Sequence, residues 1–422
     1  MSQFMPPKNV LVPLTVLVAA TLCSAADPQP APSTGAPSTS TTAEAPQSEP
    51  SAAASQPKKS GKKPKPNDGP VYTDPDAVDT DYAFQGEYRG WQRPLKSVRS
   101  TESVGLHVIA LGNGEFQGVK YYGGLPGAGW QQDGRYLLNG KLRGQRVELL
   151  GDQSDIVIEN GVATLLTHQG ERIGELQRVE RVSPTLGAAP PPGAIVLFDG
   201  SNTNQFVDAK LTPDGLLMAG TDTNGAWNDF RLHGEFRLPY KPQARGQSRG
   251  NSGFYLQNRY EVQVLDSFGL EGIENECASV YKTRRPNINM CLPPLQWQTY
   301  DMEFHAPRFD ASGKKVQDMT ITLWHNGVLV HNNQPIPNKT GAGKQEAPEP
   351  LPIKLQDHAN PVVYRNIWLV DLAPSVSGNA SPLPISATSG PTPIAWYPPY
   401  PYPPPLPVTM ANGSLVLLPF AP

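Results

Sequence analysis

The chain has 422 residues, of which 47 are proline and 39 glycine, and its formal net charge is −3. Proline lacks an amide hydrogen and fixes φ, so this many prolines must gather in linkers rather than in helices or central strands. The near-neutral charge argues against nucleic-acid binding, and plentiful aromatic and β-branched residues exclude a collagen-like or wholly disordered chain.

The first 26 residues have the form of a secretory signal peptide. Lys8 precedes an apolar run, Val10–Leu22, and the small residues Ser24-Ala25-Ala26 follow it. The run is too short to span a bilayer, and no later stretch is long and apolar enough. We therefore expect an exported protein, periplasmic or extracellular, with no transmembrane segment after cleavage; an uncleaved anchor is the alternative.

Two low-complexity segments flank the part of the chain that is expected to fold. Residues 27–70 are rich in Pro, Ala, Ser and Lys and predict a disordered linker, and residues 371–422 predict a Pro-rich disordered tail. About 300 residues remain, enough for two domains that each bury a core.

Residues 71–185 show short alternating runs, which predict a small antiparallel β domain of unknown role. Its expected hairpin turns are Asn-Gly dipeptides, which supply positive φ at little cost. They stand at Asn113-Gly114, Asn139-Gly140 and Asn160-Gly161. Residues 186–193, with Pro190-Pro191-Pro192, then predict a stiff hinge.

Residues 194–370 read as a series of strands with no long helical period, so an all-β sandwich is expected. One further hairpin is predicted at Asn326-Gly327. The expected strands are Ile195–Phe198, Asp229–Leu238, Gly253–Gln257, Tyr260–Leu265, Thr299–His305, Met319–Trp324 and Val362–Leu369.

The most informative stretch is a pair of strands joined at Asn258-Arg259. Alternation places Val262 and Val264 toward the core, and Glu261 and Gln263 on the opposite face. That face also holds Tyr255 and Gln257 if the hairpin register pairs them. We expect these polar side chains to line a solvent-filled concavity, although an ordinary exposed polar face would show the same pattern.

Several motifs in this region resemble the 3-keto-disaccharide hydrolase domain family, a former domain of unknown function with a concanavalin-like jelly roll. The resemblance covers about residues 194–370, with departures at Ala278 and Gln257. The matching motifs are Leu197-Phe198-Asp199-Gly200, Asp229–Leu238, Gly250–Gly253, Tyr260–Asp266, Cys277–Tyr281, Trp297–Tyr300, Trp324–Val328, Leu355–His358 and Tyr364–Ile367.

The resemblance implies cleavage of glycosides already oxidised to a ketone at C3. The ketone acidifies the C2–H bond, the C1 substituent leaves by elimination, and water adds back. Such a site needs a base, an acid and donors for the enolate. Glu261 is the candidate base, and Asp266 or His358 the candidate acid. The candidate substrate contacts are Asn251, Tyr255, Gln257, Gln263, Gln356, Arg365 and Trp227.

Some of these residues have structural alternatives. Asp266 ends a strand and can simply cap a turn. His358 lies in a loop before the last strand, where it can have a structural role. Arg365 can form a buried ion pair with Glu235. Trp227 is either a sugar platform or a packing residue.

Cys277 and Cys291 are the cysteines left after signal cleavage. An oxidising compartment favours a disulfide between them, with two free buried thiols as the alternative. No regular metal-ligand spacing is found, so we expect no catalytic cofactor or metal; a structural calcium ion is left open. The implied oxidised-sugar substrate requires an upstream sugar 3-dehydrogenase as a metabolic partner.

Two other functions are alternatives to the hypothesis that the protein cleaves keto-glycosides. Glu261-x-Gln263-x-x-Asp266 repeats the spacing of the Glu-x-Asp-x-x-Glu motif of retaining jelly-roll β-glucanases, but glutamine replaces the middle carboxylate and the shorter aspartate replaces the acid. A non-catalytic carbohydrate-binding surface protein fits the same fold, because fold alone does not imply catalysis.

Overall fold

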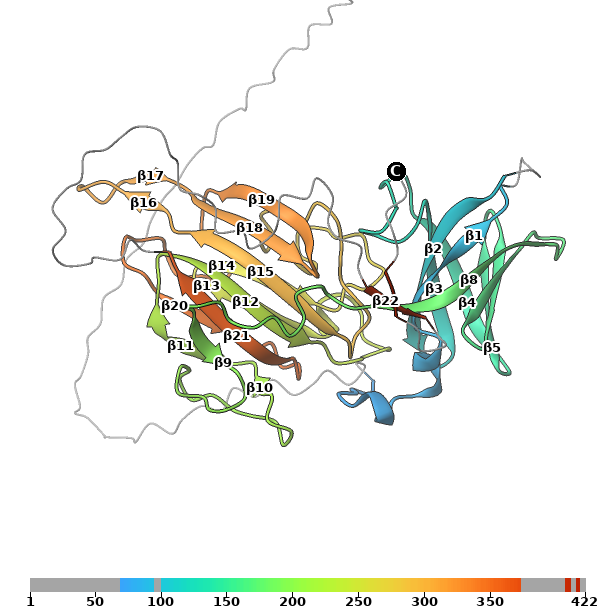
Figure 1. Cartoon of the computed structure of the whole chain (residues 1–422), viewed down its shortest axis with the longest axis horizontal. Helices are drawn as coiled ribbons and strands as arrows, with labels where there is room; N and C mark the ends of the chain where they lie inside the picture. The colour runs from blue at the N-terminus through green and yellow to red at the C-terminus, as the bar shows by residue number, and fades with distance from the viewer. Residues whose placement is uncertain (1–68, 95–99, 373–406, 411–414, 418–422) are drawn as a thin grey trace, which may run out of the picture. The chain divides into compact units, whose positions relative to one another are not determined.

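The computed structural model describes residues 69–94, 100–372, 407–410 and 415–417 (Figure 1). The predicted signal peptide and nearly all of the predicted linker lie outside these ranges. Within them the strands pair in antiparallel fashion, which confirms an all-β chain. No helix of this part is long and apolar enough to cross a membrane. Its helical turns are η1 (Pro75–Ala77), η2 (Thr80–Ala83) and η3 (Gly246–Ser248).

Eight consecutive strands form a closed barrel, where a small β domain was expected. Each strand pairs with the next, and Glu87–Gln92 pairs back onto Gly174–Val179 of the eighth strand. Alternate side chains pack inside, among them Leu106, Val108 and Leu149. The strands are β1 (Gly86–Gln92), β2 (Glu102–Gly112), β3 (Glu115–Tyr122), β4 (Tyr136–Arg143), β5 (Arg146–Gly151), β6 (Asp155–Glu159), β7 (Val162–Leu166) and β8 (Arg172–Arg181).

Two of the three predicted barrel hairpins are confirmed. Asn113 (φ 57°) and Gly114 (φ 73°) join β2 to β3, and Asn160-Gly161 joins β6 to β7 with φ of 50° and 77°. The prediction at Asn139-Gly140 is wrong, because this dipeptide lies inside β4. A Cβ on Gly140 would lie 2.4 Å from the carbonyl oxygen of Glu148, so this glycine serves close packing of neighbouring strands.

Part of the chain predicted to be a disordered tail forms strands. β22 (Pro407–Met410) pairs with β8 between Val179 and Arg181, and β23 (Leu415–Leu417) pairs with β22. Asn412-Gly413 stands between the two runs in the sequence, and such a dipeptide between two mainly apolar runs is a hairpin signal. The rest of the predicted tail lies outside the described residues.

The second set of strands forms a β-sandwich, as predicted. One sheet has the order β10-β21-β12-β15-β18-β19 with β9 on β21, the other the order β11-β20-β13-β14, and β16 and β17 form a separate ribbon. The concanavalin-like jelly-roll description stays a prediction. The strands are β9 (Ile195–Phe198), β10 (Leu217–Met218), β11 (Thr221–Ala226), β12 (Asp229–Arg237), β13 (Asn251–Leu256), β14 (Tyr260–Leu265), β15 (Trp297–His305), β16 (Arg308–Phe309), β17 (Lys315–Gln317), β18 (Met319–His325), β19 (Val328–Ile336), β20 (Pro352–Leu355) and β21 (Val363–Asp371).

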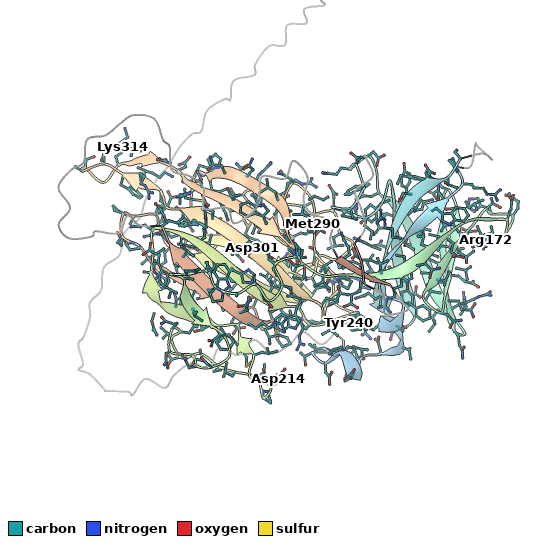
Figure 2. The ribbon with its side chains drawn as sticks, in the orientation of Figure 1. Arg172, Asp214, Tyr240, Met290, Asp301 and Lys314 are labelled. Carbon is teal, nitrogen blue, oxygen red and sulfur yellow. The ribbon has the colours of Figure 1, made fainter. Side chains whose placement is uncertain are left out.

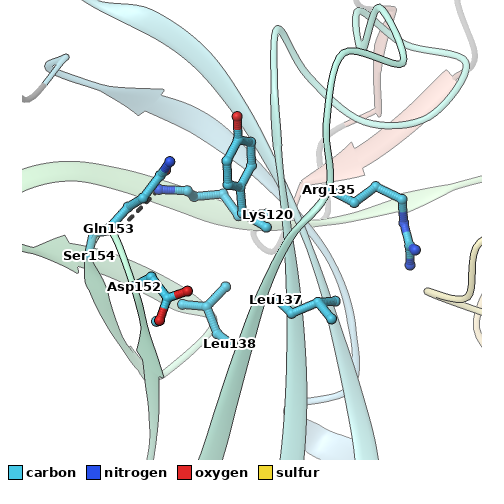
Figure 3. A pocket seen from close by; sticks show the side chains of 9 residues that line it. Lys120, Arg135, Leu137, Leu138, Asp152, Gln153 and Ser154 are labelled. Carbon is cyan, nitrogen blue, oxygen red and sulfur yellow. Dashed lines mark hydrogen bonds between the residues drawn. The ribbon is translucent and has the colours of Figure 1, made fainter.

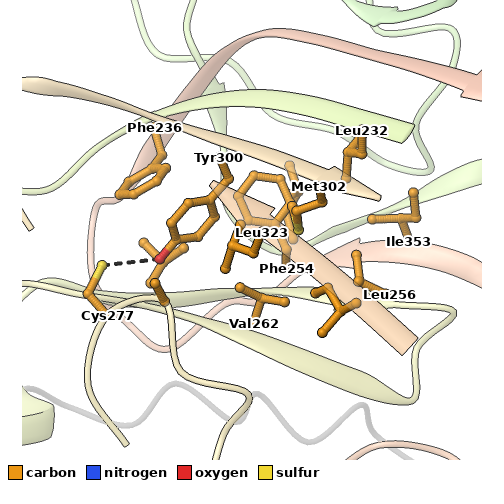
Figure 4. Packing of buried hydrophobic residues seen from close by; sticks show 14 of the residues in the cluster. Leu232, Phe236, Phe254, Leu256, Val262, Cys277, Tyr300, Met302, Leu323 and Ile353 are labelled. Atoms are coloured by element: carbon orange, nitrogen blue, oxygen red, sulfur yellow. Dashed lines mark hydrogen bonds between the residues drawn. The ribbon is translucent and has the colours of Figure 1, made fainter. Parts of the chain in front are cut away.

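Apolar side chains from both sheets meet in the sandwich core (Figure 4). Phe254 and Val262 come from the smaller sheet, and Tyr300 and Leu323 from the larger one. Burying these side chains supplies most of the driving force for the sandwich. The hairpin at Asn326-Gly327 is confirmed, with φ of 51° and 78° between β18 and β19.

The first residues of the predicted hinge are hydrogen-bonded to the sandwich. Thr185 donates through its hydroxyl to Asp301 (2.7 Å), and the Gly187 amide donates to Glu235 (2.5 Å). The carbonyl of Ala188 accepts from Asn366 (3.0 Å). The described residues form one compact unit, so the bounds of two separate domains, 71–185 and 194–370, stay predictions.

Candidate functional site

The site is built on the outward face of the β13–β14 hairpin. In its register Tyr255 lies opposite Glu261, and Gly253 lies opposite Gln263. Because side chains alternate, these residues share the face that points away from the apolar core. The turn residues are Gln257 and the following asparagine, with φ of 51° and 52°, one position earlier than expected. The predicted grouping of Glu261, Gln263 and Tyr255 on one face is therefore confirmed.

The carboxyl group of Glu261 is held by neutral donors. The Tyr255 hydroxyl donates to its Oε2 at 2.7 Å, and Gln356 donates to it as well. The Gln263 amide nitrogen faces Glu261 Oε1 at 3.2 Å, because the opposite amide orientation would leave its oxygen facing only acceptors. No ion pair to Glu261 is found among the described residues. This carboxylate is thus positioned by hydrogen bonds without a cation that would neutralise it.

Two glycines leave room for that carboxyl group. A Cβ on Gly253 would lie 3.1 Å from Cγ and Oε1 of Glu261. A Cβ on Gly341 would lie 3.5 Å from Oε2 of Glu261 and 3.3 Å from the ring of Tyr281. The ring of Tyr281 and the carboxyl group of Glu261 therefore approach the same point over the hairpin, where the loop at Gly341 carries no side chain.

The site is more enclosed than the expected solvent-filled concavity. Glu261 is 3% exposed and Gln263 1% exposed. The backbone of β14 is covered at its edge, where the Tyr281 amide donates to the Glu261 carbonyl (3.0 Å) and Thr340 accepts from the Glu261 amide (2.7 Å). Burial raises the pKa of Glu261, and the hydrogen bonds from Tyr255 and Gln356 only partly offset this rise.

Two buried acceptor atoms at this face have no hydrogen-bond partner among the described residues. They are Oδ1 of Asn251 and Oε1 of Gln356. Asn251 precedes Gly253 by two positions on β13, and its amide nitrogen donates to the Gln247 carbonyl (2.9 Å). Buried polar atoms are normally paired, so these oxygens are suited to accept from hydroxyl groups of a ligand.

Two predicted site residues lie in buried or half-buried ion pairs instead. Asp266 is fully buried and accepts from Arg249 at 2.6 and 3.0 Å, so it is a structural carboxylate. Arg365 donates to Glu235 (2.7 Å) and stacks on Trp297, with 4.0 Å from the guanidinium carbon to the ring centroid. The structure thus supports the ion-pair alternative for Arg365.

Three further candidates form no hydrogen bond or ion pair with Glu261 among the described residues. Gln257 lies in the hairpin turn and donates to the carbonyl of Trp227 (2.8 Å). The indole of Trp227 is half-buried and packs where a side chain on Gly225 would stand. His358 is exposed in the loop that joins β20 to β21, two residues beyond Gln356.

The predicted disulfide is not formed. Cys277 and Cys291 are free, buried thiols. The sulfur of Cys277 is hydrogen-bonded to the Tyr300 hydroxyl (3.2 Å, Figure 4), and that of Cys291 donates weakly to the Leu265 carbonyl (3.5 Å). Both sulfurs therefore have polar partners inside the core without a covalent link between them.

Sequence reasoning missed three contributors to the site. Gln247 lies next to Asn251 and Gln263, Tyr281 faces the carboxyl group, and Gly341 provides the open position beside them. Tyr281 closes the motif Cys277–Tyr281, and Gly341-Ala342-Gly343 is a local glycine signal. No cluster of three or more His, Cys, Asp or Glu side chains suited to a metal occurs in the described ranges.

Comparison with known proteins links the sandwich to one family. The model of the 3-keto-alpha-glucoside-1,2-lyase-like domain matches residues 193–370. A candidate glycosyl hydrolase from Parabacteroides distasonis is 33% identical, covering 43% of this chain and 85% of its own, with a TM-score of 0.40. A second one from the same organism is 18% identical, covering 43% and 94%, with a TM-score of 0.31. A search of curated proteins finds no match.

Proposed function

Because the chain belongs, through residues 193–370, to the 3-keto-alpha-glucoside-1,2-lyase-like family, we propose that it cleaves glycosides that carry a ketone at C3. The observation that supports this activity most directly is the carboxyl group of Glu261. It lies among neutral donors and its pKa is raised by burial. A carboxylate with raised basicity is suited to remove a carbon-bound proton next to a ketone.

The proposed reaction begins with transfer of the C2 proton to Glu261. The electron pair of the C2–H bond forms the enolate, which then re-forms the ketone as the C1–O bond breaks and a C1=C2 double bond forms. The leaving oxygen takes a proton, and in the hydrolytic variant water then adds at C1. The unpaired side-chain oxygens of Asn251 and Gln356 would accept hydrogen bonds from sugar hydroxyls.

The roles of the remaining predicted residues differ in support. His358 is exposed and remains a candidate proton donor. Asp266 is bound to Arg249 and is fully buried, which disfavours a double displacement with Glu261 and Asp266 as the two carboxyls. The chemistry needs a ketone made beforehand, so an oxidoreductase acting on C3 would supply the substrate, outside the cytoplasm if the chain is exported.

The test compares wild type with Glu261→Gln on a 3-keto-glucoside and on its unoxidised parent. We expect release of the leaving group from the keto sugar only, and a loss on the order of 100-fold or more in the variant. Glu274→Gln, which changes an exposed carboxylate, should keep full activity.

Other outcomes would favour the competing functions. Cleavage of the unoxidised parent would favour the retaining glycosidase. Sugar binding without any cleavage would favour a carbohydrate-binding protein.

A further inference from the structure

The barrel has a cavity that takes no part in the proposed reaction. Its volume is about 290 Å³, close to the lower limit for small-ligand pockets (Figure 3). It opens where two strands separate. β4 and β5 pair only as far as Leu138 and Gly151, whereas Tyr136 remains paired with Lys120 of β3. The loop from 152 to 154 therefore faces an unpaired edge of β4.

Lys120 is the most unusual residue in the lining. It is only 2% exposed, and its Nζ donates to Ser154 Oγ (3.0 Å) and, at 3.5 Å, to Gln92 Oε1. The Tyr122 ring centroid lies 5.1 Å away. No carboxylate lies within ion-pair distance of Lys120 in the described part of the chain. Burial lowers its pKa to about 8, partly offset by the charge of Glu102.

Other polar groups of the lining add a negative charge and an amide. Asp152 contributes a carboxylate and Gln153 an amide, whereas the guanidinium of Arg135 donates to the Gly269 carbonyl (2.5 Å). Tyr136 adds a half-buried aromatic ring. Figure 3 shows Lys120, Asp152, Gln153 and Ser154 on one side of the cavity, with Lys120 bonded to Ser154.

This mixture of groups discriminates between classes of ligand. A simple anion would be repelled by Asp152, and a simple cation by Lys120. A hydroxyl group both donates and accepts, so a ring that carries several hydroxyls can satisfy ammonium, carboxylate and amide together. The ring of Tyr136 can pack on the apolar face of such a molecule.

We propose that this barrel cavity is a second saccharide-binding site, which holds one neutral sugar unit and is independent of Glu261. It would retain a glycan near the enzyme without changing the chemical step.

The experiment uses the full chain and saturation-transfer NMR with isothermal titration calorimetry. The probes are a neutral glucose disaccharide, glucuronate and glucosamine. We expect the neutral sugar to bind, and Lys120→Met to weaken this binding about tenfold or more. Ser154→Ala, a smaller change, should weaken it in the same direction. Lys141→Met, at an exposed lysine of β4 paired with Glu115, should bind like wild type.

Failure of the proposed sugar binding in the barrel can be distinguished from failure of the proposed reaction at Glu261. Glu261→Gln should keep the Lys120-dependent binding, and Lys120→Met should keep turnover of a small 3-keto-glucoside. Preference for glucuronate or glucosamine would overturn a neutral sugar as the ligand. Undiminished binding in both Lys120→Met and Ser154→Ala, or absence of binding in wild type, would overturn the site.

Discussion

At the scale of single residues, the hydroxyl of Tyr255 favours the ionised form of Glu261 against the effect of burial. It donates to Oε2 at 2.7 Å and lowers the pKa that burial has raised. Tyr255→Phe keeps the ring but removes this donor, so the pKa of Glu261 should rise further. Since the reactive form is the carboxylate, the acidic limb of the kcat/KM profile should move to higher pH.

The measurement is the pH profile on a 3-keto-glucoside for wild type and Tyr255→Phe. Tyr122→Phe, in the barrel, is a matched control and should leave the profile unchanged. A limb that stays in place or moves to lower pH would show that Glu261 is not the titrating base.

Residue-level prediction succeeded where the pattern was local. A period of two was enough to place Glu261, Gln263 and Tyr255 on one face. It failed where a partner is distant in sequence. Asp266 is paired with an arginine 17 residues away, which no local pattern indicated. The pair of Arg365 with Glu235, 130 residues away, was one of two alternatives, and local pattern could not choose between it and a substrate contact.

At the scale of single elements, the interior of β4 should not tolerate a side chain at Gly140. A Cβ there would lie 2.4 Å from the Glu148 carbonyl oxygen and from Cδ2 of Leu149. Backbone cannot move away cheaply within a closed barrel, so Gly140→Ala should destabilise the protein by about 1–3 kcal/mol.

Thermal unfolding of the variant, followed by calorimetry, checks this expectation. The neighbouring Asn139→Ala changes an exposed side chain of the same strand and should have little effect. Equal melting temperatures for Gly140→Ala and wild type would mean that the strands separate more easily than the contacts imply.

The same dipeptide therefore serves two purposes in this barrel. Asn113-Gly114 and Asn160-Gly161 are turns, as local chemistry predicts, whereas Asn139-Gly140 lies within a strand. The difference arises from packing against β5, which is tertiary information. The strands β22 and β23 were missed for a different reason, because the proline content around them obscured two short runs of strand-forming residues, Val408-Thr409 and Leu415-Val416-Leu417.

At the scale of the whole molecule, the all-β class and the sandwich followed from strand spacing, whereas barrel closure did not. Closure pairs β1 with β8, which are far apart in sequence, and no local sequence pattern indicates that these two strands pair. The segment that leaves the barrel after β8 is then held on the sandwich by an acid–base cluster. His233 lies 2.7 Å from Asp301, which accepts from Thr185, and 3.6 Å from Glu235, which accepts from Gly187.

This cluster should make stability depend on pH. Burial alone would lower the pKa of His233, but its bonds to Asp301 and Glu235 raise it to about 9. Protonated His233 therefore stabilises the fold fully below pH 6.5, its ordinary pKa, and this contribution is lost as the pH rises through 9. The shift corresponds to a stabilisation on the order of 3 kcal/mol.

The difference in melting temperature between wild type and His233→Gln isolates this contribution from other groups that titrate in the same range. We expect a large difference at pH 6.5 that shrinks by pH 9.5, because the histidine of the wild type is then neutral as well. His358→Gln replaces an exposed histidine and should give a small difference at every pH. A His233→Gln difference that stays constant or grows with pH would mean that the segment after β8 is held by packing and neutral hydrogen bonds rather than by a charged histidine.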